Sequence, residues 1–295
     1  MRAIKHIILF CSLLLAAVPG HAQYRNFDKA YKLFQEKKLD SARIFIDSAA
    51  INPQTQKDIQ TWLVRGFIYK ELYKQKESNN VNSPLREVAV QSFKEFLKLD
   101  STKTNQQRET VLKSIKYQAA TYHNDIAKTL DTVNYQQSLK NAEKHKELMK
   151  MLDPSFDEKT YDYDIYLILG SMFEKDYETT DSKNLLDLAK VYLFKAYEIK
   201  NNTFSINKNI GFLYYNQAVS IIKKMDYDIP LDQLPVYQDQ SVKLGQQALS
   251  YCLKAHELNP NDCAVLEALE GIYYLLNDNE KHNEFKKKKH EIGCK

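Results

Sequence analysis

Small and apolar residues recur along most of the chain at spacings of three, four and seven. Residues at such spacings lie on one face of an α-helix, and polar residues cover the other faces. The pattern therefore predicts a chain made of amphipathic helices. The residues that carry it are Ala42, Ile46 and Ala49; Ala89, Phe93 and Phe96; Ala189, Leu193 and Ala196; and Ala248, Cys252 and Ala255.

In a second pattern, a small residue precedes an aromatic residue by three positions. The pairs are Gly66 and Tyr69, Ala119 and Tyr122, Gly170 and Phe173, Gly211 and Tyr214, and Gly271 and Tyr274. Glycine inside a helix costs about 1 kcal/mol relative to alanine, so its repeated use indicates that a neighbouring helix passes too close for a side chain. The helices with this pattern are predicted to pack closely against the others.

Proline marks where several of these helices end. Because proline disfavours the helical conformation in the residue before it, an apolar stretch that runs into proline predicts a helix end. Interleaving the patterns gives alternating first and second helices, in five or six pairs. The three ends are Asn52 and Pro53, Asp153 and Pro154, and Asn259 and Pro260.

The helix pairs resemble tetratricopeptide repeats (TPRs), whose first helix carries Trp, Gly and Tyr and whose second carries Ala, an aromatic residue, Ala and a closing Pro. The second pair matches best in its first helix, with Trp62, Gly66 and Tyr69. The resemblance implies an all-α solenoid of five to six antiparallel helix pairs. The approximate repeats are 24–53, 58–101, 107–154, 160–201, 204–260 and 262–292.

The repeats depart from the family in length. In the family, the small residue of the first helix precedes that of the second by twelve positions, whereas here the gap is 12, 23, 23, 19 and 37 in the first five pairs. The extra residues are therefore predicted to lie between the two helices of a pair, at one edge of the solenoid, or to lengthen the helices. The segments 76–84 and 225–240 are the predicted edge insertions.

The N-terminus has the features of a secretory signal peptide. Arg2 and Lys5 precede an apolar run over residues 7–18, and Gly20 and Ala22 place small residues before a cleavage site at Gln23. The run is too short to cross a bilayer, which takes about 20 apolar residues. We therefore expect residues 1–22 to be cleaved, leaving a mature chain of residues 23–295 with no transmembrane segment in the periplasm or cell envelope.

Composition and motifs argue against catalysis and against nucleic-acid binding. The formal net charge of +4 falls to +2 without Arg2 and Lys5, which is small for a protein that binds a polyanion. The chain contains no phosphate-binding glycine loop and no nucleophile elbow. No two histidines of the mature chain stand three or four residues apart, as a metal pair on one helix requires. We expect no enzyme, no cofactor and no metal.

TPRs generally present a concave groove of first helices to a protein or peptide. The groove positions that the resemblance implies here alternate cations and amides with aromatics, which suits an extended segment with some acidic character. Leu167 and Phe212 have a second interpretation, as packing residues between helices. The full set is Lys70 of the second pair; Lys116, His123 and Asn124 of the third; Leu167 and Glu174 of the fourth; and Lys208, Phe212, Tyr215 and Asn216 of the fifth.

The leading hypothesis is a non-enzymatic envelope scaffold that binds a protein or peptide segment in this groove. Two alternatives stay open. One is a structural adaptor of an envelope complex that contacts its partners through the inserted edge. The other is a glycan-binding helical-repeat protein that uses exposed tyrosines. The lack of a cysteine placed to accept a lipid counts against this second alternative.

The mature chain has three cysteines, Cys252, Cys263 and Cys294. Cys252 occupies a predicted buried position of its helix. Cys263 begins the first helix of the sixth pair and Cys294 follows the second, and antiparallel helices bring these two ends together. Two alternatives stay open for Cys263 and Cys294: they form a disulfide with each other, or both are free thiols. The bridge would close a loop of about 30 residues and stabilise this end of the chain by about 3 to 4 kcal/mol.

Overall fold

The structure is a computed structural model that describes residues 24–225, 230 and 232–294. The predicted signal peptide, residues 1–22, lies outside the described residues, as do residues 226–229 and 231 of the predicted insertion at 225–240. The described residues form α-helices joined by turns and include no strand, which confirms the all-α prediction.

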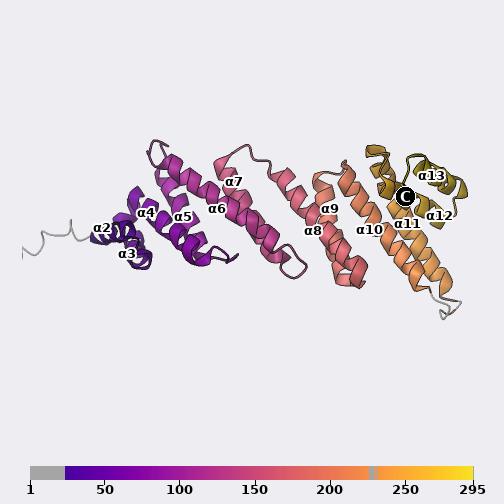
Figure 1. Cartoon of the computed structure of the whole chain (residues 1–295), viewed down its shortest axis with the longest axis horizontal. Helices are drawn as coiled ribbons and strands as arrows, with labels where there is room; N and C mark the ends of the chain where they lie inside the picture. The colour runs from indigo at the N-terminus through magenta and orange to yellow at the C-terminus, as the bar shows by residue number, and fades with distance from the viewer. Residues whose placement is uncertain (1–23, 226–229, 231, 295) are drawn as a thin grey trace, which may run out of the picture. The chain divides into compact units, whose positions relative to one another are not determined.

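The helices follow one another in adjacent pairs (Figure 1). Short 3₁₀ and π-helical turns, η1 (Thr55–Lys57) and η2 (Tyr73–Glu77), flank α4. The α-helices are α2 (Arg25–Gln35), α3 (Leu39–Ile51), α4 (Ile59–Leu72), α5 (Pro84–Leu99), α6 (Arg108–Lys128), α7 (Tyr135–Leu152), α8 (Glu158–Thr180), α9 (Lys183–Ile199), α10 (Phe204–Lys224), α11 (Leu234–Leu258), α12 (Cys263–Leu275) and α13 (Asn279–Glu291).

The chain divides into two compact units, residues 1–128 with 137–155 and residues 129–136 with 156–295. In unit 1, α2 packs on α3 and α4 on α5. Hydrogen bonds from Ser138 to the Ile126 carbonyl and between His145 and the Ala119 carbonyl show that α7 runs antiparallel to α6. In unit 2 the pairs are α8 with α9, α10 with α11 and α12 with α13. This is the TPR-like architecture that the sequence predicts.

Gly66, Gly170 and Gly211, in the first helices α4, α8 and α10, are notches for side chains of the second helices. An ideal Cβ built on Gly66 would lie 2.4 Å from the Phe93 ring, and one on Gly211 would lie 2.6 Å from the Cys252 Sγ. Phe93 and Cys252 are fully buried. The glycines therefore allow the two helices of each pair to approach closely, as the small-residue pattern predicts.

Adding a methyl group at Gly170 should destabilise unit 2, although alanine is the better helix former by about 1 kcal/mol. Its Cβ would lie 2.6 Å from the Leu193 side chain and 3.0 Å from the Leu193 backbone nitrogen, which cannot move aside. We expect Gly170→Ala to lower the free energy of unfolding by about 1 to 3 kcal/mol in urea titrations. Gly271→Ala is the control, because its Cβ would meet only the far end of the Tyr215 side chain. An equal loss in both variants would contradict the notch interpretation.

The extra length of the repeats goes partly into loops and partly into helices. The second pair has η2 and a turn between α4 and α5, and the fifth has residues 225–233 between α10 and α11. In the fourth pair, by contrast, only residues 181–182 separate α8 from α9, because α8 itself is 23 residues long. The insertion is therefore a loop in the second pair and a longer first helix in the fourth.

The last pair closes unit 2 with a polar helix. Phe285 is the one buried residue of α13 among those described, and Lys287, Lys288 and Lys289 form ion pairs with glutamates. The structure joins Cys263, the first residue of α12, to Cys294 in a disulfide with the Cα atoms 5.6 Å apart. Such a separation lies within the range of protein disulfides. Cys252 is buried and unbridged, and burial raises the pKa of its thiol to about 12.

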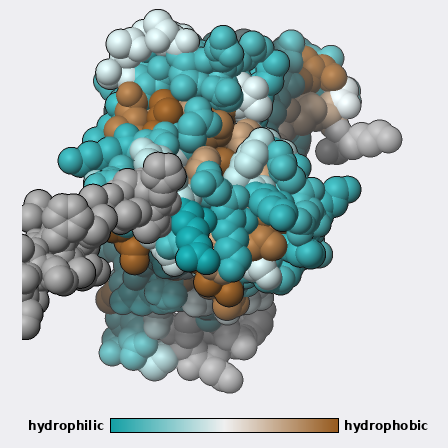
Figure 2. Space-filling view, turned by 90° about the vertical axis from the view of Figure 1, so that its left-hand side faces the viewer, coloured by the Kyte–Doolittle hydropathy of each residue, from teal (hydrophilic) through white to brown (hydrophobic). Residues whose placement is uncertain are grey.

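None of the described helices is both long and apolar enough to cross a membrane. Viewed from the side of α2 and α3, the surface is mostly hydrophilic and is broken by small separate hydrophobic patches (Figure 2). Isolated patches of this kind are ordinary on protein surfaces. A partner that contacts this side would meet mainly polar and charged groups.

Candidate functional site

The predicted groove residues of unit 1 lie on two neighbouring first helices, α4 and α6. Lys70 of α4 donates a hydrogen bond to Ser114 of α6 at 3.4 Å, which places the two helices side by side here. Burial and the neighbouring Lys74 ammonium lower the pKa of Lys70. Lys74 in turn lies 5.0 Å above the ring of the exposed Tyr117. The structure thus gathers two cations and an exposed aromatic ring on this side of unit 1.

The other three predicted residues of unit 1 project from α6 into solvent. Lys116, His123 and Asn124 are all exposed. Positions seven and eight residues apart share one helix face, so the three side chains lie along a single stripe. Lys116 forms no ion pair with any described residue, so its charge is available to a partner.

His123 and His145 lie close together, although their spacing in the sequence does not predict a contact. They stand 22 residues apart, on α6 and α7, and their ring centroids lie 5.0 Å apart. Burial lowers the pKa of His145, with a smaller contribution from His123, and the Ala119 carbonyl engages its Nδ1. The structure shows no cluster of three or more metal-ligating side chains within the described residues.

In unit 2, polar side chains of α8 and α10 join these two first helices. Asn209 donates to Ser171 at 2.5 Å, Asn216 donates to Glu178, and Lys224 pairs with Asp181. A hollow of about 410 Å³ opens between the C-terminal halves of the two helices. Its lining includes Tyr177, Glu178 and Asp181 of α8 and Asn216, Ser220, Lys223 and Lys224 of α10. Asn216 is one of these lining residues, and its amide already donates to Glu178.

Glu174 lies one turn before this hollow on α8, and it is buried, with 8% of its surface exposed. It makes no hydrogen bond or ion pair with another described residue. Burial, helped by the negative charge of Glu178, raises the pKa of Glu174 to about 8. The carboxyl is therefore largely protonated at neutral pH and can donate a hydrogen bond. Leu167, two turns earlier on α8, is half-buried.

The raised pKa of Glu174 predicts that stability falls as pH rises. Below about pH 4.5 the carboxyl is protonated in both states, and between about 4.5 and 8 only the unfolded chain releases its proton. Glu174→Gln should therefore be about as stable as the wild type at pH 4 and more stable by roughly 3 to 5 kcal/mol at pH 9. Urea titrations at both pH values measure this. Glu178→Gln, at an exposed position, should change the pH dependence less, and identical pH profiles for wild type and Glu174→Gln would contradict the prediction.

The predicted groove residues of α10 are engaged by their own chain. Lys208 pairs with both oxygens of Asp262 at 3.0 Å and lies over the rings of Phe204 and Phe212. Phe212 and Tyr215 pack against the core formed by α11, α12 and α13. Phe212 therefore makes packing contacts inside unit 2. The charge of Lys208 is already balanced inside unit 2.

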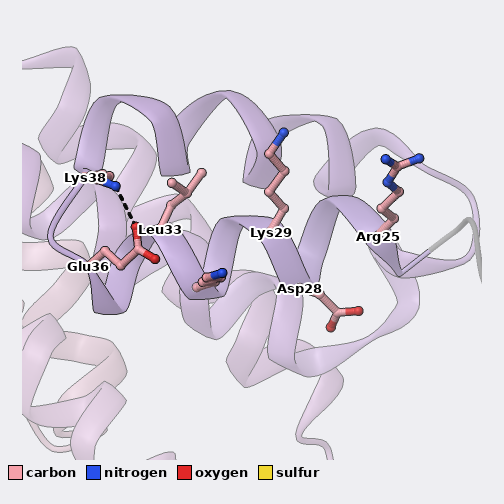
Figure 3. Close-up of a pocket in the computed structure, with 7 residues that line it drawn as sticks. Arg25, Asp28, Lys29, Leu33, Glu36 and Lys38 are labelled. Carbon is pink, nitrogen blue, oxygen red and sulfur yellow. Dashed lines mark hydrogen bonds and ion pairs between the residues drawn. The ribbon is translucent and has the colours of Figure 1, made fainter.

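The N-terminal helix α2 carries a cation-rich hollow that the groove prediction omits (Figure 3). It has a volume of about 690 Å³ and is lined by residues of α2 and of the turn that follows it, among them Arg25, Lys29, Glu36 and Lys38. Lys38 pairs with Glu36 at 2.8 Å, and Lys29 lies 4.0 Å above the Phe45 ring. The periodic Arg and Lys residues of α2 could have indicated it from sequence.

Two tyrosines line a further hollow, in unit 2, beside several amide side chains. Tyr197 and Tyr251 meet edge to face at 5.7 Å, and the hollow of about 500 Å³ also includes Asn201, Asn202 and Asn207. Aromatic rings beside amides are the chemistry that the glycan-binding alternative needs. The helical spacing of these tyrosines hid them among core residues.

No family model and no curated protein matches the sequence. Among solved structures, the chain is similar to the crystal structure of PilW, a widely conserved type IV pilus biogenesis factor, at 14% identity and a TM-score of 0.32, over 91% of this chain and 92% of that one. It is also similar to the TPR2AB domain of yeast Sti1 in complex with pHSP90, at 16% identity and a TM-score of 0.26, over 92% and 99%. Likenesses at these TM-scores support no inference about function, so the TPR-like architecture stands on the helix packing itself.

Proposed function

We propose that this protein is a non-enzymatic scaffold of the cell envelope that binds an acidic protein segment on the first-helix surface of unit 1. The observation that carries the proposal is the exposed stripe of Lys116, His123 and Asn124 on α6. Lys116 has no internal counter-ion among the described residues, whereas Lys208 of unit 2 is paired with Asp262. Opposite charge on the partner would therefore be recognised in unit 1.

The envelope location is part of the same proposal and is supported by the N-terminal sequence. Arg2, Lys5 and the apolar run 7–18 have the composition of a signal peptide. The intact mass of the protein recovered from the envelope should correspond to a chain beginning at Gln23. A full-length chain beginning at Met1 in a membrane fraction would contradict export.

The binding proposal is tested by selecting peptides from a displayed random library with the mature protein. Enriched peptides should be rich in Asp and Glu, and Lys116→Glu should weaken their binding by roughly tenfold. Helical content and melting temperature should hardly change, because surface substitutions usually cost within about 0.5 kcal/mol. Lys98→Glu is the matched control, since Lys98 is a well-exposed lysine on the second helix α5.

The same experiment separates the two alternatives. Binding that survives Lys116→Glu but is lost when residues 225–240 are shortened would favour the adaptor that uses the inserted edge. Binding to envelope polysaccharide, lost in Tyr251→Ala, would favour the glycan-binding protein. Either result would overturn the assignment to the exposed stripe of α6.

A further inference from the structure

The two units of the chain carry opposite net charges, which the small total charge does not show. Unit 1 without the predicted signal peptide, residues 23–128 and 137–155, holds 23 Lys and Arg against 15 Asp and Glu. Unit 2, residues 129–136 and 156–295, holds 17 Lys and Arg against 23 Asp and Glu. An anionic surface would therefore attract unit 1 and repel unit 2.

Within unit 1, cations without an internal counter-ion gather in the first helix pair. The acidic residues Glu36, Asp40 and Asp47 of this pair are each paired with a cation, at 2.6 to 2.9 Å. Six Lys and Arg residues of the pair and of the turn after it form no ion pair with a described residue. They are Arg25, Lys29, Lys32, Lys37, Arg43 and Lys57. Much of the positive charge of this pair is therefore available to a partner.

Three of these cations form the basic face of α2, which consists of Arg25, Lys29 and Lys32. Their spacings of four and three place them on one side of the helix, and all three are exposed. They line the hollow of about 690 Å³ (Figure 3). Ala30 and Phe34 of α2 belong instead to the core of unit 1. Because the apolar side of α2 is occupied in this way, the helix can meet another surface only with its polar side.

Two exposed tyrosines accompany the basic face. Tyr24 and Tyr31 are 43% and 45% exposed, and their spacing of seven places them on one stripe. Tyrosine is enriched at membrane–water interfaces, where its ring lies at the level of the lipid headgroups. Lysine is a point charge on a flexible stem, so it needs no fixed geometry in its partner. This combination suits a layer of anionic headgroups better than the fixed carboxylates of a folded protein.

We propose that the basic face of α2 docks on an anionic lipid surface. Arg25, Lys29 and Lys32 contact the phosphates of the headgroups, and Tyr24 and Tyr31 lie among the headgroups. The core-facing side of α2 stays packed in unit 1, so docking inserts no helix into the bilayer. The basic face is separate from the exposed stripe of α6, so this site does not rest on the proposed scaffold function.

The test is co-sedimentation of the mature protein with lipid vesicles. Phosphatidylcholine vesicles that contain about 30% phosphatidylglycerol should bind the protein at low salt, and vesicles of phosphatidylcholine alone should bind it at least about tenfold more weakly. Raising the NaCl concentration to about 0.5 M should release most of the protein, because salt screens the attraction between exposed charges.

Variants test whether the basic face itself makes the contact. Each basic residue close to an anionic bilayer strengthens binding roughly fivefold, so Arg25→Glu with Lys32→Glu should weaken vesicle binding at least about tenfold. Lys98→Glu with Lys113→Glu is the matched control, since these exposed lysines of α5 and α6 change the net charge of unit 1 equally. The control should weaken binding less than about threefold. Asp28→Asn removes the one acidic residue of α2 and should strengthen binding a few-fold.

All of these variants change exposed side chains, so circular dichroism should show unchanged helical content. The proposal is overturned if the protein binds both kinds of vesicle equally, or neither at low salt. An equal loss in the control pair and in the α2 pair would also overturn it, because net charge alone would then explain the binding. If the protein ignores vesicles but binds poly-glutamate, and only the α2 pair loses that binding, the basic face belongs to an acidic protein segment. Lys116→Glu should leave vesicle binding nearly unchanged, which keeps this result separate from the peptide selection.

Discussion

Replacing Asp125 with alanine should destabilise unit 1 by about 3 to 5 kcal/mol, because it leaves the Arg86 guanidinium buried without its counter-ion. The two side chains are 1% and 2% exposed and pair at 2.6 Å. Arg86 also lies over the Tyr122 ring, at 3.8 Å from its centroid. Urea denaturation followed by circular dichroism measures the loss.

The control for this prediction removes both charges. In the double variant Arg86→Met with Asp125→Leu, apolar side chains of similar size fill the space, so much of the lost stability should return. The loss in Asp125→Ala would then belong to the unpaired charge and not to a cavity. If Asp125→Ala loses less than about 1 kcal/mol, water reaches Arg86 and the pair is not a buried one.

Removing the disulfide should have the second large effect. Cys263 and Cys294 enclose a loop with a sequence separation of 31, and a bridge of this span stabilises by about 3 to 4 kcal/mol in the chain-entropy model. Cys263→Ser with Cys294→Ser should therefore loosen α12 and α13, which pack mainly on each other. Hydrogen exchange of the backbone amides in these two helices measures this directly.

Dithiothreitol provides the control. It should lower the melting temperature of the wild type to that of the double serine variant and leave the variant unchanged. Cys252 should not contribute, since its buried thiol has a raised pKa and is inert. A wild type that does not respond to reductant under conditions where free thiols appear would show that the bridge adds no stability.

Much of the fold could be read from local patterns. A glycine such as Gly66 or Gly211 signals a close helix contact by itself, because its helix cost must be offset by packing. Pro53, Pro154 and Pro260 follow helices that end at residues 51, 152 and 258. These features depend on neighbours within one helical turn, which sequence spacing reports directly.

The candidate site was only partly predictable. The resemblance pointed to Lys116, His123 and Asn124, which the structure places at exposed positions of α6. It could not show that Lys208 has an internal partner in Asp262, 54 residues later. Such pairs depend on how successive repeats stack, and a repeat signature describes only one pair at a time.

What the sequence determined by itself is therefore the helical class, the pairing of helices and the glycine notches, since these follow from periodicity and backbone sterics. Only the tertiary structure decided which charges are free, which are paired and which are buried. The raised pKa of Glu174 comes mainly from burial by the packed helices, and the salt bridge of Arg86 joins α5 to Asp125 of α6. Burial and electrostatics depend on these long-range neighbours, and no spacing along the chain encodes their distances.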